Sequence, residues 1–90
     1  MKGSSIMRSI WEALSDPTRR EILVILKKGE LTAGQIYEHF DITKPSLSHH
    51  LSILKETNLV FSKKVGQNII YALNLVAFNE VIEYIRGLKK

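Results

Sequence analysis

Apolar positions in residues 6–56 recur every three or four residues, which is the spacing of amphipathic helices. Four helices are predicted in this part of the chain. Suitable N-caps precede the last three of them, at Asp16, Thr32 and Thr43. Proline or the partner residue of a capping box follows each cap within one turn, so the starts of these helices are well marked.

After Asn58 the period changes from 3.6 to about two. Residues 59–65 and 69–73 are rich in β-branched and aromatic side chains and flank Gly66-Gln67-Asn68, which predicts a β-hairpin. A wide apolar stripe after Asn74 predicts a final helix. The predicted fold is therefore mainly α with a small β-hairpin, a winged helix-turn-helix. Residues 1–90 form one domain in this prediction, with 1–5 as a flexible leader.

The composition narrows the possible classes. A chain of 90 residues makes one small domain, and its lack of cysteine excludes disulfides and thiolate metal ligands. No apolar run reaches the roughly 20 residues that span a bilayer, so we expect no membrane insertion and a cytoplasmic protein. The net charge of +4 is compatible with a polyanionic partner.

The predicted fourth helix carries the first candidate site. Leu47, Leu51 and Leu54 share one face, which we expect to point into the core. The opposite face of its N-terminal half presents short polar and basic side chains: Lys44, Pro45, Ser48 and His49, with Thr43 at the tip and His50 nearer the flank. Such side chains can bond to base edges in a major groove, and a helix N-terminus favours phosphate. A merely capped, solvated helix face would have the same composition.

The predicted hairpin carries the second candidate site. Lys63 and Lys64 precede its turn, and Gln67 and Asn68 lie in it. A cationic hairpin tip beside a groove-reading helix can contact phosphates or reach a minor groove. Lysines on a solvated edge strand also discourage aggregation, so the pair is informative only together with the preceding helices.

Metal binding and catalysis are poorly supported. His49 and His50 project about 100° apart on a helix, and His39 is the only other histidine, so no ligand set is evident. Ser48 beside His49 lacks an acidic orienting residue and an oxyanion feature. We expect no enzyme activity, no catalytic residue, no metal site and no cofactor.

The first and last predicted helices carry more apolar surface than a domain of this size can easily cover. Pairing two copies would bury this surface, and a two-fold dimer would provide two recognition helices about one DNA turn apart. The expected interface residues are Ile6, Ile10, Trp11, Phe78, Val81, Ile82 and Ile85.

Three stretches together resemble the ArsR-type winged-helix transcriptional repressors: "ALSDPTRREIL" (13–23), "LTAGQIYEHFDITKPSLSHHLSILKETNLV" (31–60) and "KKVGQNIIYALN" (63–74). Within that family the chain looks most like the small autorepressor branch associated with sporulation-delaying toxin operons. The resemblance implies a homodimeric repressor on a pseudo-palindromic operator that overlaps a promoter.

Carried over by position, the resemblance implies recognition-helix contacts from Lys44, Pro45, Ser48 and His49. Ser46 and His50 are peripheral in this assignment, and Lys63, Lys64 and Gln67 match the basic tip of the wing. Family members dimerise through their first and last helices, in agreement with the apolar stripes above.

The chain departs from the metal-sensing members of that family. Their third helix carries a Cys-x-Cys pair where this chain has "IYEHFD", and no histidine accompanies Asn79, Glu80 and Glu83 on the last helix. Metal-independent control is therefore expected. No recognisable motif reveals the operator sequence or the signal that releases the DNA. Release by an unidentified protein or small-molecule anti-repressor, or by dilution of the dimer, stays open.

Two rival hypotheses remain at this point. One is a winged-helix protein-interaction module whose polar helix face or apolar stripe binds another protein. The other is a metal-responsive sensor that uses the three histidines.

Overall fold

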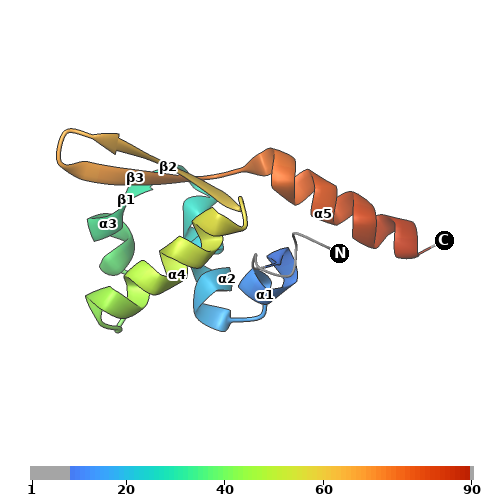
Figure 1. Cartoon of the computed structure of the whole chain (residues 1–90), viewed down its shortest axis with the longest axis horizontal. Helices are drawn as coiled ribbons and strands as arrows, with labels where there is room; N and C mark the ends of the chain where they lie inside the picture. The colour runs from blue at the N-terminus through green and yellow to red at the C-terminus, as the bar shows by residue number, and fades with distance from the viewer. Residues whose placement is uncertain (1–8, 90) are drawn as a thin grey trace.

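The computed structural model describes residues 9–89, which form five helices and three strands (Figure 1). In chain order the elements are α1 (Ile10–Leu14), α2 (Pro17–Leu26), β1 (Leu31–Thr32), α3 (Ala33–Tyr37), α4 (Lys44–Glu56), β2 (Val60–Val65), β3 (Asn68–Leu73) and α5 (Leu75–Leu88). The predicted class, mainly α with a small antiparallel sheet, is confirmed. The predicted leader 1–5 and Ile6 lie outside the described residues.

The sheet has one strand more than the predicted hairpin. Leu31 and Thr32 pair with Tyr71 and Ile70, so the strand order is β1-β3-β2. Two residues are too few to show an alternating pattern, which is why the sequence did not reveal this strand. Thr32 also caps α3, where its hydroxyl accepts from Gln35 N while the Gln35 side chain accepts from Thr32 N. Strand and helix therefore join without a loop.

Asn58 explains where α4 ends and the hairpin begins. Its φ of 66° places it in the left-handed region, which asparagine tolerates better than most residues. Asn58 N donates to Lys55 O and Leu59 N donates to Leu54 O, each at 3.0 Å, so the end of α4 forms a Schellman motif. Leu54 and Leu59 are both fully buried, which supplies the hydrophobic contact that accompanies this motif.

The hairpin turn is shorter than predicted. Val65 pairs with Asn68, so only Gly66 and Gln67 lie between the strands, and Asn68 belongs to β3. Gly66 has a φ of 62°, as the first central position of a type II′ turn requires.

The core lies between α2, α3, α4 and the inner face of the sheet. Its buried apolar side chains are Ala13, Ile22, Leu23, Leu26, Ile36, Leu47, Leu51, Ile53, Leu54, Leu59, Val60 and Ala77. The three leucines expected on the inner face of α4 are among them, so the rotational setting of this helix is confirmed.

Helix α5 projects away from this core and contributes only Ala77 to its buried residues (Figure 1). Helix α1 lies beside it, and the rings of Trp11 and Tyr84 are 5.7 Å apart. Within residues 9–89 no helix is long and apolar enough to cross a membrane.

Candidate nucleic-acid interface

The N-terminal half of α4 presents a continuous exposed polar face. Thr43 caps the helix by accepting from Ser46 N at 3.2 Å, and no acidic residue lies in its first turn. We call the exposed positions on this side the reading face: Lys44, Pro45, Ser48, His49 and Ser52. The positive end of the helix dipole is therefore free of carboxylates from its own first turn, as suits a phosphate neighbour.

Ser52 was not predicted as a site residue. It is exposed one helical turn beyond Ser48, so the same periodicity that placed Ser48 on the outer face also indicates Ser52. Ser46, predicted as peripheral, is half-buried.

The two adjacent histidines have different surroundings. His49 is exposed on the reading face, whereas the side chain of His50 is only 14% exposed. His50 Nδ1 lies 3.1 Å from Arg19 Nη1 and 3.9 Å from the nearer Asp16 oxygen. His50 is thus held against the start of α2, on the flank of α4.

Arg19 is the residue of this region that the sequence hypothesis missed. Only 8% of it is exposed, and its guanidinium also donates to the carbonyls of Ala13 (2.9 Å) and Glu12 (3.0 Å) at the end of α1. The signal was present in the sequence, because Arg19 shares the spacing of the buried residues Ile22, Leu23 and Leu26.

A cleft of ≈ 560 Å³ separates the reading face from α3 and from the hairpin. Three lining residues carry charged or hydroxyl groups, namely Glu38, Lys44 and Ser48. The other lining residues are mainly apolar or aromatic: Ala33, Gly34, Tyr37, Leu47, Leu51, Ile69 and Tyr71. Lys44 Nζ lies 5.5 Å from the centre of the Tyr37 ring, a cation–π distance that holds the ammonium group over α3. Burial raises the pKa of the Tyr71 hydroxyl.

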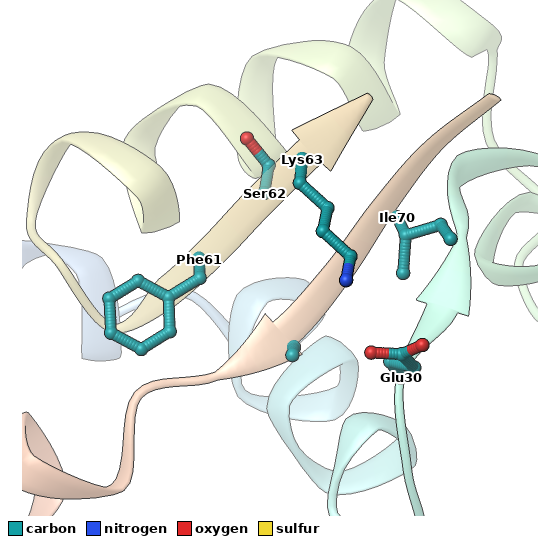
Figure 2. Close-up of a pocket in the computed structure, with 6 residues that line it drawn as sticks. Glu30, Phe61, Ser62, Lys63 and Ile70 are labelled. Carbon is teal, nitrogen blue, oxygen red and sulfur yellow. The ribbon is translucent and has the colours of Figure 1, made fainter. Parts of the chain in front are cut away.

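The wing lysines lie on opposite faces of the hairpin. Lys64 pairs with Ile69, which lines the cleft beside α4, so Lys64 faces the same side as that cleft. Lys63 pairs with Ile70 on the outer face, and Figure 2 shows its side chain directed toward Glu30. Gln67 and Asn68 are exposed at the tip. The strand register therefore places Lys64, but not Lys63, on the side of the hairpin that faces the cleft beside α4.

The residues expected at a dimer interface divide into two groups. Ile10 and Phe78 pack partly against the core, and Val81 is half-buried. Trp11, Ile82 and Ile85 are 50%, 46% and 50% exposed. Together with other exposed apolar residues of the last helix they form what we call the α1–α5 face: Trp11, Ile82, Tyr84, Ile85 and Leu88.

Metal-ligating side chains do not converge in the described part of the chain. No group of three or more histidines or carboxylates in residues 9–89 is arranged to hold a metal ion. His39 follows the end of α3, and its Nδ1 lies 3.0 Å from Gln35 O.

These features define a class of protein. Helices α3 and α4 form a helix-turn-helix, the exposed face of α4 is polar and basic, and a β-hairpin lies beside it as a wing (Figure 1). This is the architecture of a winged-helix DNA-binding protein.

Comparison with known proteins identifies the family. Residues 16–62 match the family model of the bacterial regulatory proteins of the arsR family, and the chain belongs to that family. It is 49% identical over 78 residues to the transcriptional repressor SdpR of Bacillus subtilis (strain 168), covering 87% of each chain. It is 42% identical over 79 residues to the arsenical resistance operon repressor of Staphylococcus xylosus, covering 88% of this chain and 72% of that protein.

The solved structures agree with this assignment. An ArsR family transcriptional regulator superposes with a TM-score of 0.83 at 29% identity, over 89% of this chain and 82% of that one. The protein is therefore a DNA-binding transcriptional repressor of the ArsR family and not an enzyme.

Proposed function

We propose that the chain represses transcription as a homodimer bound to a pseudo-palindromic operator. The reading face of α4 enters the major groove, and the wing contacts the flanking backbone or minor groove. Residues 1–90 act as a single DNA-binding domain in the cytoplasm.

The exposed reading face carries this proposal. The core buries Leu47, Leu51 and Leu54, so the polar side of α4 cannot turn inward without exposing them. His49 and the hydroxyls of Ser48 and Ser52 can then donate to or accept from base edges, which is the chemistry of direct readout.

The wing supports the same orientation of the duplex. Lys64 lies on the side of the hairpin that faces the cleft beside α4, and Gln67 lies in the turn at the end of the hairpin. A sugar-phosphate strand that follows the reading face would pass this tip, where a lysine can neutralise a phosphate.

The α1–α5 face supports the dimer. Five large apolar side chains, each 46–68% exposed, lie on two adjacent helices. A contiguous exposed apolar patch of this kind is typical of a protein interface, and a two-fold axis through it would double the number of reading faces.

The experiment that tests the proposal is selection of duplexes by the full-length protein from a random-sequence pool. We expect enrichment of an inverted repeat whose half-site centres lie about 10 base pairs apart or a multiple of that spacing. Two protomers should bind each duplex in analytical ultracentrifugation. Enrichment of no sequence, or binding no tighter than to shuffled DNA at moderate salt, would favour the protein-interaction module instead.

Release of the operator is proposed to depend on an anti-repressor, either a protein or a small molecule. The rival metal sensor predicts that zinc changes the affinity for the selected duplex. Titration with and without a chelator tests this, and we expect the same dissociation constant in both.

A further inference from the structure

Arg19 joins three helices through one side chain. From α2 it donates Nε–H to Ala13 O and Nη2–H to Glu12 O, which are carbonyls at the end of α1. Its third nitrogen, Nη1, lies 3.1 Å from Nδ1 of His50 on α4. Every branch of the guanidinium therefore has a fixed acceptor, and the group has little freedom to move.

This geometry determines the protonation state of His50. An arginine side chain can only donate hydrogen bonds, so His50 Nδ1 must be the acceptor. The imidazole is therefore neutral and carries its proton on Nε2. A protonated ring would present N–H against N–H at this contact.

His50 is also next to His49, the histidine of the reading face. The ring centroids of His49 and His50 are 5.9 Å apart, and both residues lie in the half of α4 that presents the reading face. The leucines of α4 fix its rotation only through apolar packing, which is not directional. The Arg19–His50 hydrogen bond is directional, and it ties α4 to α2 beside the reading face.

We propose that Arg19 is a positioning residue for sequence reading: its guanidinium holds the neutral ring of His50 and thereby sets how α4 presents His49 to a base edge. The proposal rests on the function proposed above. It predicts that losing the contact lowers affinity for the selected duplex more than affinity for shuffled DNA, because phosphate contacts tolerate a small rotation of α4 better than base contacts do.

The charged and titratable groups around His50 make the contact sensitive to pH. They are Asp16, the N-cap of α2, Arg19 on α2 and His49 on α4. Burial lowers the pKa of His50, Arg19 and His49 lower it further, and Asp16 opposes them. The pKa of Asp16 is itself lowered: burial raises it, but the backbone N–H of Arg19, the charge of His50, the backbone N–H of Thr18 and the charge of Arg19 together lower it by more.

The sign of the pH effect follows from these shifts. The neutral ring, and with it the Arg19 contact, persists below the ordinary histidine value of 6.5 and is lost as the pH falls through the lower pKa of His50. Arg19 Nη1 then loses its acceptor, and the protonated ring is drawn to the Asp16 carboxylate, which lies 3.9 Å from Nδ1. Protonation of histidines also strengthens phosphate binding in general, so the informative quantity is the ratio of the two affinities.

The test is fluorescence polarisation with the duplex that the wild type selects and a shuffled duplex of equal length, from about pH 8 to about pH 5.5 at constant ionic strength. The measured quantity is the affinity for the selected duplex divided by the affinity for the shuffled duplex. We expect this ratio to decrease for the wild type as the pH is lowered. At neutral pH, Arg19→Gln should have a ratio about tenfold below that of the wild type. In His50→Asn, the amide oxygen takes the position of Nδ1 and can accept from Arg19, but it does not titrate. The affinity ratio of this variant should therefore not decrease as the pH is lowered. His39→Asn is the control and should keep it.

A second measurement needs no variant and no DNA. Ring ¹⁵N spectra of the free protein should show His50 as the Nε2–H tautomer, with a pKa below the ordinary histidine value of 6.5. An Nδ1–H tautomer, or equal losses on both duplexes in Arg19→Gln, would overturn the positioning role. Failure to select any duplex would refute the proposed function, while the tautomer would still report on the Arg19–His50 contact.

Discussion

Truncating Ile85 to alanine tests the proposed dimer most directly. Ile85 lies between Ile82 and Leu88 along α5 and is 50% exposed in the single chain. The exposed half of its side chain does not stabilise the fold of one protomer, but it would be buried by a partner that covers this face. We expect Ile85→Ala to weaken dimerisation without unfolding the chain.

The magnitude follows from the exposed fraction. Complete burial of an isoleucine side chain contributes about 1.5–3 kcal/mol, so burying the exposed half contributes about 1 kcal/mol. A two-fold interface contains the residue twice, which makes the loss about 2 kcal/mol per dimer. At 1.4 kcal/mol per decade this corresponds to a dissociation constant raised roughly 30-fold.

Sedimentation equilibrium over a wide concentration range measures this constant. Val24→Ala is the matched control, because Val24 is 57% exposed and lies on α2, outside the α1–α5 face. We expect the control to dimerise like the wild type and both variants to keep the wild-type helical circular dichroism. Equal dissociation constants for the two variants would refute the proposed interface, and a wild-type chain that stays monomeric at high concentration would refute the dimer.

Three further predictions concern the reading face, the wing and the core. His49→Ala should cost about 1–3 kcal/mol on the selected duplex and far less on shuffled DNA, measured by polarisation; equal losses would assign His49 to a phosphate. Lys64→Ala should reduce the slope of log affinity against log salt by about one, whereas Lys63→Ala, on the outer face of the hairpin, should change it less, and equal slopes would contradict the orientation of the wing. Leu54→Ala should lower the free energy of unfolding by about 2–5 kcal/mol in urea denaturation, because this side chain is fully buried, and a loss as small as that of Val24→Ala would show that the core can collapse around the site.

Local rules predicted most of the secondary structure. The predicted caps at Asp16, Thr32 and Thr43 each accept a backbone N–H from the first turn of their helix, and Asn74 caps α5 in the same way. Such signals act over three or four residues, so they can be recognised without knowing the fold. The strand at Leu31–Thr32 was not predicted, because it is defined only by its pairing with β3, about 40 residues later in the chain.

The rotational setting of α4 was also available from the sequence. Three leucines at i, i+4 and i+7 define one face, and the exposed side of the helix follows from them. The separation of His49 from His50 was therefore predicted in outline, since neighbouring residues on a helix point about 100° apart.

The order of the five helices and the hairpin, the inner face of α4 and its polar side thus followed from the sequence alone, because periodicity and capping are local properties. The partners of those faces became known only from the folded structure. In it, Arg19 contacts His50, and Lys64 rather than Lys63 lies on the side of the hairpin that faces the cleft beside α4. These contacts join residues 31 positions apart or depend on strand register, so they are set by how the helices and strands pack and not by any local pattern.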